Sequence, residues 1–416
     1  INALSVWFDM HHFQNPTEPA AVAMLERLRA LLRAARAVGM SAGIVALANE
    51  GYASTPTHLR AKGTGRAHYG VEVCVATAEG EAQVLENFRG EFAAFQEVGL
   101  DCLTLWPYDQ GGCGCPNCAP WGRRGMLQIG EQVARLFRAH FPQGQVAFST
   151  WLFDYGSDQG EWQHLSEAFA QPPDWVDFIQ ADSHDRFPRH PLEHGVPGGL
   201  PLLNFPEISM YGMCPWGALG ANPLLRRFAG LWGEVAHLAA GGFPYSEGIY
   251  EDLNKIAYAH FYWTGQNDPS AAIAEYARFE FGGAHPATVQ RVLALLEDNH
   301  GFYWQWPASV SAWGPARRTV PVAGFPGWQR HLPPATANPA RAGEAAQLCT
   351  TLASTMPAWA SQSWRWRLLA IRALLDHELL QHGGEPTPAC TAAWRELTDW
   401  YHAAQGEASV APPLPG

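Results

Sequence analysis

The stretch Leu105-Trp-Pro-Tyr-Asp-Gln-Gly-Gly-Cys-Gly-Cys-Pro-Asn-Cys118 joins an apolar run to a tight turn that holds one carboxylate and three cysteines. Residues 103–106 are apolar and predict a buried strand, which the Pro- and Gly-rich segment ends. Asp109 therefore lies directly at a strand exit. Cys113, Cys115 and Cys118 follow in a C-x-C-x-x-C spacing, which suits a clamp that holds this exit in shape.

The same alternation of apolar runs and amphipathic stretches extends from residue 1 to about residue 265. Short strands separated by helices are typical of βα units in a parallel sheet. The predicted strands are residues 3–8, 42–48, 102–106, 146–151, 176–180, 202–205 and 242–245. Helical spacing between them is clearest at residues 19–38, 81–98, 127–140 and 224–239.

This count of βα units favours a (β/α)₈ TIM-type barrel that lacks its first strand in this chain. The alternative, an open doubly wound sheet, requires no missing strand. Polar or aromatic residues follow nearly every predicted strand, namely Asp9, His11, Asn49, Glu50, Tyr108, Asp109, Asp154, Asp182, Glu207 and Glu247. Because functional residues of barrels gather on the C-terminal face, this regularity favours the barrel.

Two further regions complete the predicted organisation. Residues 51–80 form an insertion too long for an ordinary βα loop, and such loops usually belong to the functional site. After residue 265 helical patterns follow, at residues 269–281, 285–299, 340–355, 362–382 and 389–404, and a Pro- and Trp-rich connector over residues 304–339 interrupts them. We therefore predict a catalytic barrel over residues 1–265 and an α-helical module over residues 266–416, through which the chain could form a homo-oligomer.

Composition and charge restrict the partner. The net charge of −12 opposes binding to nucleic acid or to an anionic membrane surface. No apolar stretch reaches the roughly 18 residues that a membrane helix requires. A polar or neutral small substrate, such as a carbohydrate, fits better. The chain starts at Ile1 in a strand-like run, so a leader could precede it; the cytoplasm is the preferred compartment.

The carboxylates at the strand ends are the candidate catalytic groups. Glycosidic cleavage requires a carboxylic acid that protonates the leaving oxygen and a second carboxylate that assists attack. Asp109, Glu207 and Glu247 are the principal candidates, because the last two are embedded in apolar and aromatic sequence that would raise their pKa. Asp154 and Asp182 could instead be helix caps or partners of Arg, or could bind substrate.

Aromatic residues alternate with these carboxylates along the chain. The flat faces of aromatic rings stack on the apolar C–H faces of sugars, so an acidic mouth lined by aromatic residues suits a carbohydrate. Any single aromatic residue at a strand end could instead belong to the core. The predicted substrate-binding residues are Trp7, His11, Glu50, Trp106, Tyr108, Trp151, Asp154, Asp182, Tyr211, Trp216 and Tyr245.

Two groups of residues could bind metal. Cys113, Cys115 and Cys118 could give three thiolates to a structural Zn²⁺, with Cys74 of the long insertion as the fourth ligand. The alternative is free thiols in a Gly-rich turn. His11 and His12, with Asp9, could bind a catalytic metal, although the H-E-x-x-H pattern is absent. The main hypothesis therefore includes no cofactor for catalysis.

Asp109 followed by C-x-C-x-x-C resembles a broad group of bacterial glycosidase-like barrels related to β-N-acetylhexosaminidases and xylan-type α-glucuronidases. The resemblance covers residues 1–265, and the helical module is similar to the C-terminal helices of those α-glucuronidases. It implies a (β/α)₈ barrel and glycoside hydrolase activity. Those hexosaminidases carry an adjacent Asp-Glu pair, where the substrate's acetamido group is the nucleophile. Here Gln110 follows Asp109, which departs from that pattern.

We therefore predict a glycoside hydrolase that cleaves an oligo- or polysaccharide with Asp109, Glu207 and Glu247. Glu207 is the preferred proton donor, Asp109 stays ionised beside the reacting sugar, and Glu247 binds hydroxyls or acts as the second catalytic carboxylate. Two alternatives stay open. One is a metal-dependent hydrolase that uses Asp9, His11 and His12. The other is a carbohydrate-binding protein without turnover on the same barrel.

Overall fold

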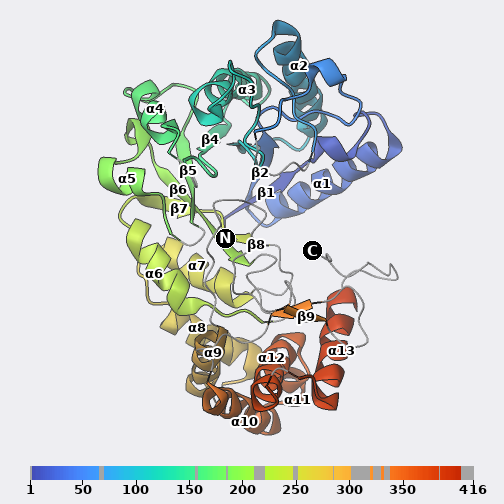
Figure 1. The fold of residues 1–416 in the computed structure, drawn as a ribbon, viewed down its shortest axis with the longest axis vertical. Coiled ribbons are helices and arrows are strands. Elements are labelled where there is room, and N and C mark those ends of the chain that lie inside the picture. The colour runs from blue at the N-terminus through green and yellow to red at the C-terminus, as the bar shows by residue number, and fades with distance from the viewer. Residues whose placement is uncertain are drawn as a thin grey trace.

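The structure is a computed structural model of the 416-residue chain. It describes residues 2–64, 70–154, 158–183, 186–209, 221–246, 252–283, 285–300, 319–321, 329–331, 338–383 and 385–403. Figure 1 shows helices α1 to α6 around the outside of the strands, and helices α8 to α13 gathered at the end of the molecule remote from α2.

A parallel sheet in sequence order forms the first part of the chain. Its strands are β1 (Ala3–Trp7), β2 (Ser41–Leu47), β3 (Cys102–Trp106), β4 (Gln145–Ser149), β5 (Phe178–Ser183), β6 (Leu202–Ser209) and β7 (Ala239–Gly242). Each strand pairs in parallel with the next, for example Ile44 with Leu103 and Asp182 with Phe205. A doubly wound sheet would reverse its strand order at a switch point. The unbroken order confirms a (β/α) barrel that lacks one strand.

The gap in the barrel lies between β7 and β1. Among the described residues, β1 and β7 form the two edges of the sheet and do not pair with each other. The predicted last strand, residues 242–245, is wrong in detail, because the chain forms β7 and then β8 (Tyr245–Ser246), which both pair with β6. A Cβ atom at Gly242 would lie 2.2 Å from the Asn204 carbonyl oxygen, so the close approach of β7 to β6 requires glycine there.

Helices alternate with these strands. They are α1 (Pro19–Ala37), α2 (Ala78–Phe95), α3 (Gly125–His140), α4 (Glu161–Ala168), α5 (Arg189–His194), α6 (Leu225–Val235) and α7 (Asp252–Thr264). Short 3₁₀ turns are η1 (Met10–His12), η2 (Thr57–Leu59), η3 (Trp121–Arg123) and η4 (Pro197–Gly199). The four clearest predicted helices are confirmed, except that the last of them ends at Val235 and residue 239 already belongs to β7. Helices α4 and α5 have too few turns for apolar periodicity to reveal them.

Apolar faces of these helices pack on the outer face of the sheet. Phe88, Phe92 and Phe95 of α2 are fully buried, and Phe92 contacts Phe137 of α3 with ring centroids 5.5 Å apart. The Thr77 hydroxyl accepts a hydrogen bond from Gly80 N at 3.1 Å and caps α2. Buried Phe, Leu, Ile and Val side chains of this kind contribute about 1.5–3 kcal/mol each, so the first core stabilises the sheet strongly.

A second core belongs to the C-terminal helices. They are α8 (Ser270–Phe281), α9 (Pro286–His300), α10 (Pro339–Thr355), α11 (Ala358–Ser361), α12 (Trp364–Gln381) and α13 (Pro388–Ala403). Between α9 and α10, β9 (Thr319–Pro321) and β10 (Gln329–His331) form an antiparallel pair. Ala221, from the chain before α6, packs into this second core. The helical C-terminal region is confirmed, and a domain boundary near residue 265 stays a prediction.

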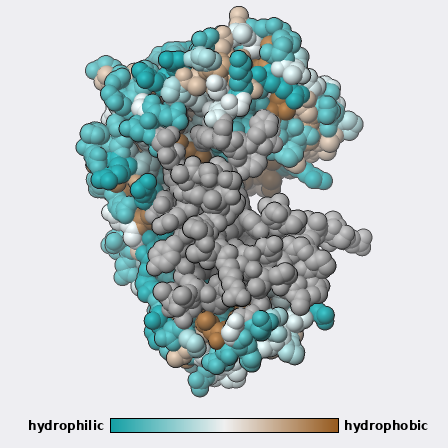
Figure 2. Space-filling view, in the orientation of Figure 1, coloured by the Kyte–Doolittle hydropathy of each residue, from teal (hydrophilic) through white to brown (hydrophobic). Residues whose placement is uncertain are grey.

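The described surface is mainly hydrophilic on the face that Figure 2 shows, with scattered hydrophobic residues. Large apolar side chains with high exposure include Trp263 at 90%, Phe279 at 79% and Val38 at 74%. Within the described residues, no helix combines the length and the apolar character that a membrane crossing requires.

Candidate active site

The carboxyl ends of the parallel strands bring the predicted site residues to one edge of the sheet. Asp9 follows β1, Glu50 follows β2 and Asp109 follows β3. Trp151 follows β4, and β5 and β6 contribute Asp182 and Glu207 near their own ends. Because parallel neighbours share their direction, these positions gather on one face, which is where barrels carry function.

An aromatic cluster lies at the centre of this face. Trp106, Trp151 and Phe205 are at most 9% exposed and form a small core of their own with Leu47 and Leu152. Their ring centroids lie 5.4–5.5 Å apart in all three pairs, with edge-to-face geometry. Edge-to-face contacts of this kind hold aromatic side chains in defined positions.

Three predicted aromatic residues surround this aromatic cluster. The Tyr245 ring stacks on Phe205 at 5.6 Å, and the Trp7 ring contacts Tyr108 at 5.5 Å and Trp106 at 6.3 Å. All three side chains are only partly buried. The structure therefore places Trp7, Tyr108 and Tyr245 at the rim of the aromatic cluster, while Trp106 and Trp151 lie within it.

Asp109 is held directly against the aromatic cluster. The indole Nε1 of Trp151 donates a hydrogen bond to Asp109 Oδ1 at 2.7 Å. Tyr108, the preceding residue, has a φ of 57°, a left-handed conformation that is uncommon for a non-glycine residue. Such backbone outliers are often found at functional sites. Gln110, the residue after Asp109, is 3% exposed, and its Oε1 lies 3.5 Å from the backbone N of Gly70.

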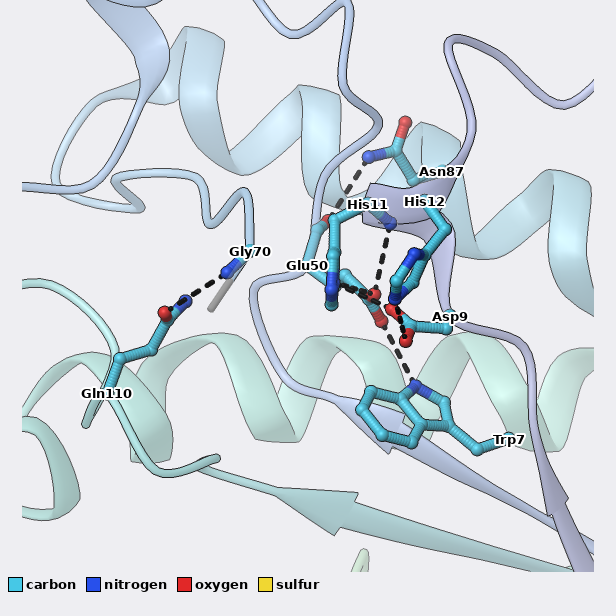
Figure 3. Close-up of polar contacts among 8 residues, drawn as sticks. All are labelled: Trp7, Asp9, His11, His12, Glu50, Gly70, Asn87 and Gln110. Carbon is cyan, nitrogen blue, oxygen red and sulfur yellow. Dashed lines mark hydrogen bonds and ion pairs between the residues drawn. The ribbon is translucent and has the colours of Figure 1, made fainter. Parts of the chain in front are cut away.

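A second polar group joins the exits of β1 and β2. His11 Nδ1 lies 2.7 Å from Asp9 Oδ1 and 3.0 Å from Glu50 Oε1, so one imidazole bridges two carboxylates (Figure 3). His12 Nε2 lies 2.9 Å from the other oxygen of Asp9. Trp7 Nε1 donates to Glu50 Oε2 at 3.4 Å, which connects this group to the rim of the aromatic cluster (Figure 3).

Burial and charge shift the protonation of this group. Burial favours the neutral form of Glu50, which is 1% exposed, and together with the charge of Asp9 it outweighs the hydrogen bond from His11. The pKa of Glu50 is raised to about 7. Burial alone would lower the pKa of His11, but its bonds to Asp9 and Glu50 raise this pKa to about 9. Near neutral pH the group therefore contains an imidazolium between two acidic side chains.

The two predicted carboxylates of the later strands are also buried. Glu207 is 2% exposed and lies opposite Tyr245 in the register between β6 and β8. Asp182 is 5% exposed and lies opposite Phe205 between β5 and β6. Both therefore adjoin aromatic residues of the mouth. Glu247, Tyr211 and Trp216 lie outside the described residues.

Asp154 has the capping geometry that the sequence left as an alternative. Its Oδ1 accepts from Gln159 N at 2.7 Å and Glu161 N at 3.1 Å, and its Oδ2 accepts from Trp162 N at 3.0 Å. These backbone groups lie at the start of α4. Asp154 thus satisfies free N–H groups of a helix N-terminus, as an acidic cap does.

The predicted cysteine group is assembled from two separate segments. The sulfur atoms of Cys74, Cys113, Cys115 and Cys118 all lie within 4.8 Å of one another. The thiol of Cys118 and the backbone N–H groups of Cys115 and Lys62 lower the pKa of Cys113 to about 4. A thiolate at this position is therefore stabilised by several donors.

Asn204 is a buried polar residue that the sequence analysis did not identify, and its partners place it between the sheet and α7, not in the aromatic cluster. It is 1% exposed on β6, donates to Ser183 Oγ at 2.7 Å, and its Oδ1 lies 3.3 Å from the hydroxyl of Tyr262. A polar residue inside the apolar run Leu202-Leu-Asn-Phe205 was the available signal.

No protein-family model matches the sequence, and no curated protein matches it. Solved structures do match. A family 89 glycoside hydrolase from Clostridium perfringens in complex with 2-acetamido-1,2-dideoxynojirimycin has a TM-score of 0.57 at 13% identity, over 90% of this chain and 42% of that one. The same enzyme in complex with its substrate GlcNAc-α-1,4-galactose gives a TM-score of 0.58 at 12% identity, over 90% and 41% of the two chains.

An O-GlcNAc hydrolase from Thermobaculum terrenum has a TM-score of 0.50 at 9% identity, over 99% of this chain and 92% of that chain. At such low identities the similarity establishes the fold alone. This chain spans about two fifths of the length of the family 89 structures.

Proposed function

We propose that this chain is a glycoside hydrolase that cleaves an O-glycosyl bond of a hexosamine- or uronic-acid-containing saccharide. The observation that carries the proposal is the position of Asp109, which Trp151 holds at a strand exit beside the aromatic cluster. Glu207 lies two residues after Phe205, another member of this cluster. Carboxyl groups among aromatic rings provide both parts of a glycosidase site, acid–base chemistry and stacking surfaces. The hexosamine ligand and substrate named for the structural neighbours support the same substrate class.

In the proposed reaction, the carboxyl group of Glu207 donates its proton to the glycosidic oxygen as the C–O bond breaks. Glu207 is 2% exposed and lies opposite Tyr245, so its carboxyl group is shielded from bulk water. Water then adds to the anomeric carbon and returns a proton to a carboxylate. Asp109, with a hydrogen bond from Trp151, stabilises the positive charge that develops on the sugar. Glu247 is proposed as the second catalytic carboxylate or a ligand of sugar hydroxyls.

Gln110 follows Asp109 at the position where the hexosaminidases that the sequence resembles carry the Glu of an Asp-Glu pair. Its side chain is buried, and its Oε1 faces the backbone N of Gly70. We propose that Asp109 orients the substrate, so that any acetamido-assisted reaction would take its proton from Glu207 or Glu247. The α-glucuronidase-like alternative stays open, because Trp7 at the rim and the positively charged His11 beside it could bind a hydroxyl or a carboxylate of the sugar.

Replacement of Glu207 tests the proposal. Glu207→Gln removes the proton but keeps the shape of the side chain. We expect kcat to fall at least about 100-fold on a substrate with a poor leaving group, and far less on an activated aryl glycoside. Glu91→Gln is the matched control, because Glu91 is also buried, at 3% exposure, but lies on α2. Equal losses on both substrates would move the acid role away from Glu207.

One observation favours a second candidate function. Ligand atoms of Asp9, His11 and His12 lie within 4.8 Å of one another, as a metal-dependent hydrolase would require. Against this, His11 Nδ1 already bridges Asp9 and Glu50. His12→Gln, measured for activity and for bound metal, distinguishes the two functions. A glycosidase that acts through Glu207 keeps its kcat in this variant, whereas a metal-dependent hydrolase loses both metal and turnover.

A further inference from the structure

Four cysteines from two distant segments meet beside the strand that leads to Asp109. Cys74 lies in the chain just before α2, and Cys113, Cys115 and Cys118 lie between β3 and α3. The last three are buried, and Cys74 is half-buried. All four sulfur atoms lie within 4.8 Å of one another. Such an arrangement depends on the fold, because 39 positions separate Cys74 from Cys113.

The sulfur spacing fits a shared ion better than a disulfide. The Sγ atoms of Cys74 and Cys115 are 3.7 Å apart. In a tetrahedral site with Zn–S bonds of about 2.3 Å, two sulfur ligands are separated by about 3.8 Å. A disulfide would require about 2.05 Å. The Cys74–Cys115 pair thus has the spacing of a tetrahedral tetrathiolate site, and all four sulfur atoms lie within 4.8 Å of one another.

Backbone N–H groups around the sulfur atoms support thiolate ligands. Lys62 N donates to Cys113 Sγ at 3.4 Å, and the N–H of Ala76 is directed at Cys74. Hydrogen bonds to metal ligands orient them and balance their charge. Lys62 belongs to the insertion that contributes Cys74, so its bond to Cys113 joins the two halves of the cluster.

The two segments are in close contact next to the cluster. Gly114 N donates to the Lys62 carbonyl oxygen at 2.8 Å, and a Cβ atom at Gly114 would lie 2.4 Å from the Gly63 carbonyl oxygen. The Thr64 hydroxyl also donates to the carbonyl oxygen of Gln110. Residues 62–64 are therefore fastened to the same turn that presents Asp109.

We propose that Cys74, Cys113, Cys115 and Cys118 bind one Zn²⁺ in a closed, structural site. The ion fastens the insertion between β2 and α2 to the turn after β3 and so holds Asp109 and Gln110 at the mouth. Four thiolates occupy every position of a tetrahedral zinc ion, so the ion binds no substrate. The zinc proposal stands whether or not the proposed glycosidase function is correct.

The test measures the zinc content of the full chain by elemental analysis. The protein is purified without chelator and dialysed against a buffer that contains zinc. We expect about one zinc per chain in the wild type and in the control Cys102→Ser, and a strong loss in Cys74→Ser and Cys113→Ser. Cys102 is a matched control, because it begins β3 and its thiol contacts Ser5 at the far end of the strand. Less than about 0.2 zinc per chain in the wild type overturns the proposal.

Equal zinc in wild type and Cys113→Ser would also overturn the proposal, because the ion would then lie elsewhere, as at Asp9, His11 and His12. A variant that fails to fold does not prevent the test. Co²⁺ added to metal-free wild type should give the intense visible absorption of tetrahedral tetrathiolate cobalt, and its absence counts against the site. Disulfides among these four cysteines in the purified protein, detected by mass spectrometry, would also count against the zinc site. None of these measurements requires turnover, so they stand apart from the glycosidase assay.

Discussion

Replacement of Glu50 by Gln tests the buried charge at the exit of β2. The variant keeps the shape of the side chain and an oxygen near His11 Nδ1, but it removes an ionisable group. Burial raises the pKa of Glu50 from 4.5 to about 7 in the folded protein. The folded state therefore binds a proton on Glu50 at a pH where the unfolded chain does not. This contribution to stability is complete below about pH 4.5 and is lost as the pH rises through about 7.

The size of the effect follows from the same pKa. One pKa unit equals about 1.4 kcal/mol, so the rise from 4.5 to about 7 corresponds to about 3 kcal/mol. We expect the free energy of unfolding of the wild type, relative to Glu50→Gln, to fall by about this amount between pH 4.5 and pH 7. Above pH 6.5 the raised pKa of His11 adds a second loss of stability with rising pH, which ends near pH 9 in the wild type. In Glu50→Gln this second loss of stability ends at a lower pH, because the charge of Glu50 no longer stabilises the imidazolium of His11.

The assay is urea unfolding of both proteins at a series of pH values, and the comparison cancels the titration of groups that do not interact with Glu50. Glu79→Gln is the control, since the carboxylate of Glu79 also contacts a histidine, His58, at 3.2 Å, but is 68% exposed. Its stability should follow the wild type within about 0.5 kcal/mol at every pH. A wild-type to Glu50→Gln difference that stays constant from pH 4.5 to pH 7 would refute the reasoning.

Three further replacements test other contacts. Trp151→Phe removes the 2.7 Å hydrogen bond to Asp109, a charge-assisted bond worth about 1.5–3 kcal/mol. We therefore expect kcat/KM for a glycoside to fall about 10- to 100-fold, and unchanged kinetics would contradict a role for Asp109. Asp154→Ala leaves three backbone N–H groups at the start of α4 without their acceptor and should cost about 1–2 kcal/mol in urea unfolding, whereas Asp154→Asn should cost less. Arg372→Ala removes the partner of Asp376, which lies 2.8 Å away in the second core. The free energy of unfolding should fall by about 3–5 kcal/mol, and a fall of less than 1 kcal/mol would show that the pair is not buried in solution.

Local sequence patterns determined the βα alternation and most element positions. The apolar runs of β1 to β6 and the long periodic helices α1 and α3 could be located from the sequence, because burial of one face requires a matching period. Helices α4 and α5 were too short to give a period. The division of the last strand into β7 and β8 depends on contacts with β6, which no local pattern shows.

The predicted site shows the same division. The sequence placed Asp109 at a strand exit and suggested Cys74 as the fourth cysteine of the group, because strand ends and a lone cysteine in the long insertion can be recognised along the chain. It left two roles open for Asp154, since a carboxylate near a helix start has the same sequence signature whether it caps the helix or faces a substrate. The structure shows the hydrogen bonds to the helix N-terminus.

The sequence by itself determined which residues lie at strand ends, because that depends on the local alternation of apolar and polar side chains. Only the tertiary structure decided which of them touch. His11 reaches Glu50 across 39 positions and Trp151 reaches Asp109 across 42, and both contacts arise because neighbouring parallel strands end at the same edge. Hydrogen bonds and pKa values depend on distances of a few ångströms and on exclusion of water, and these quantities exist only once the strands have packed.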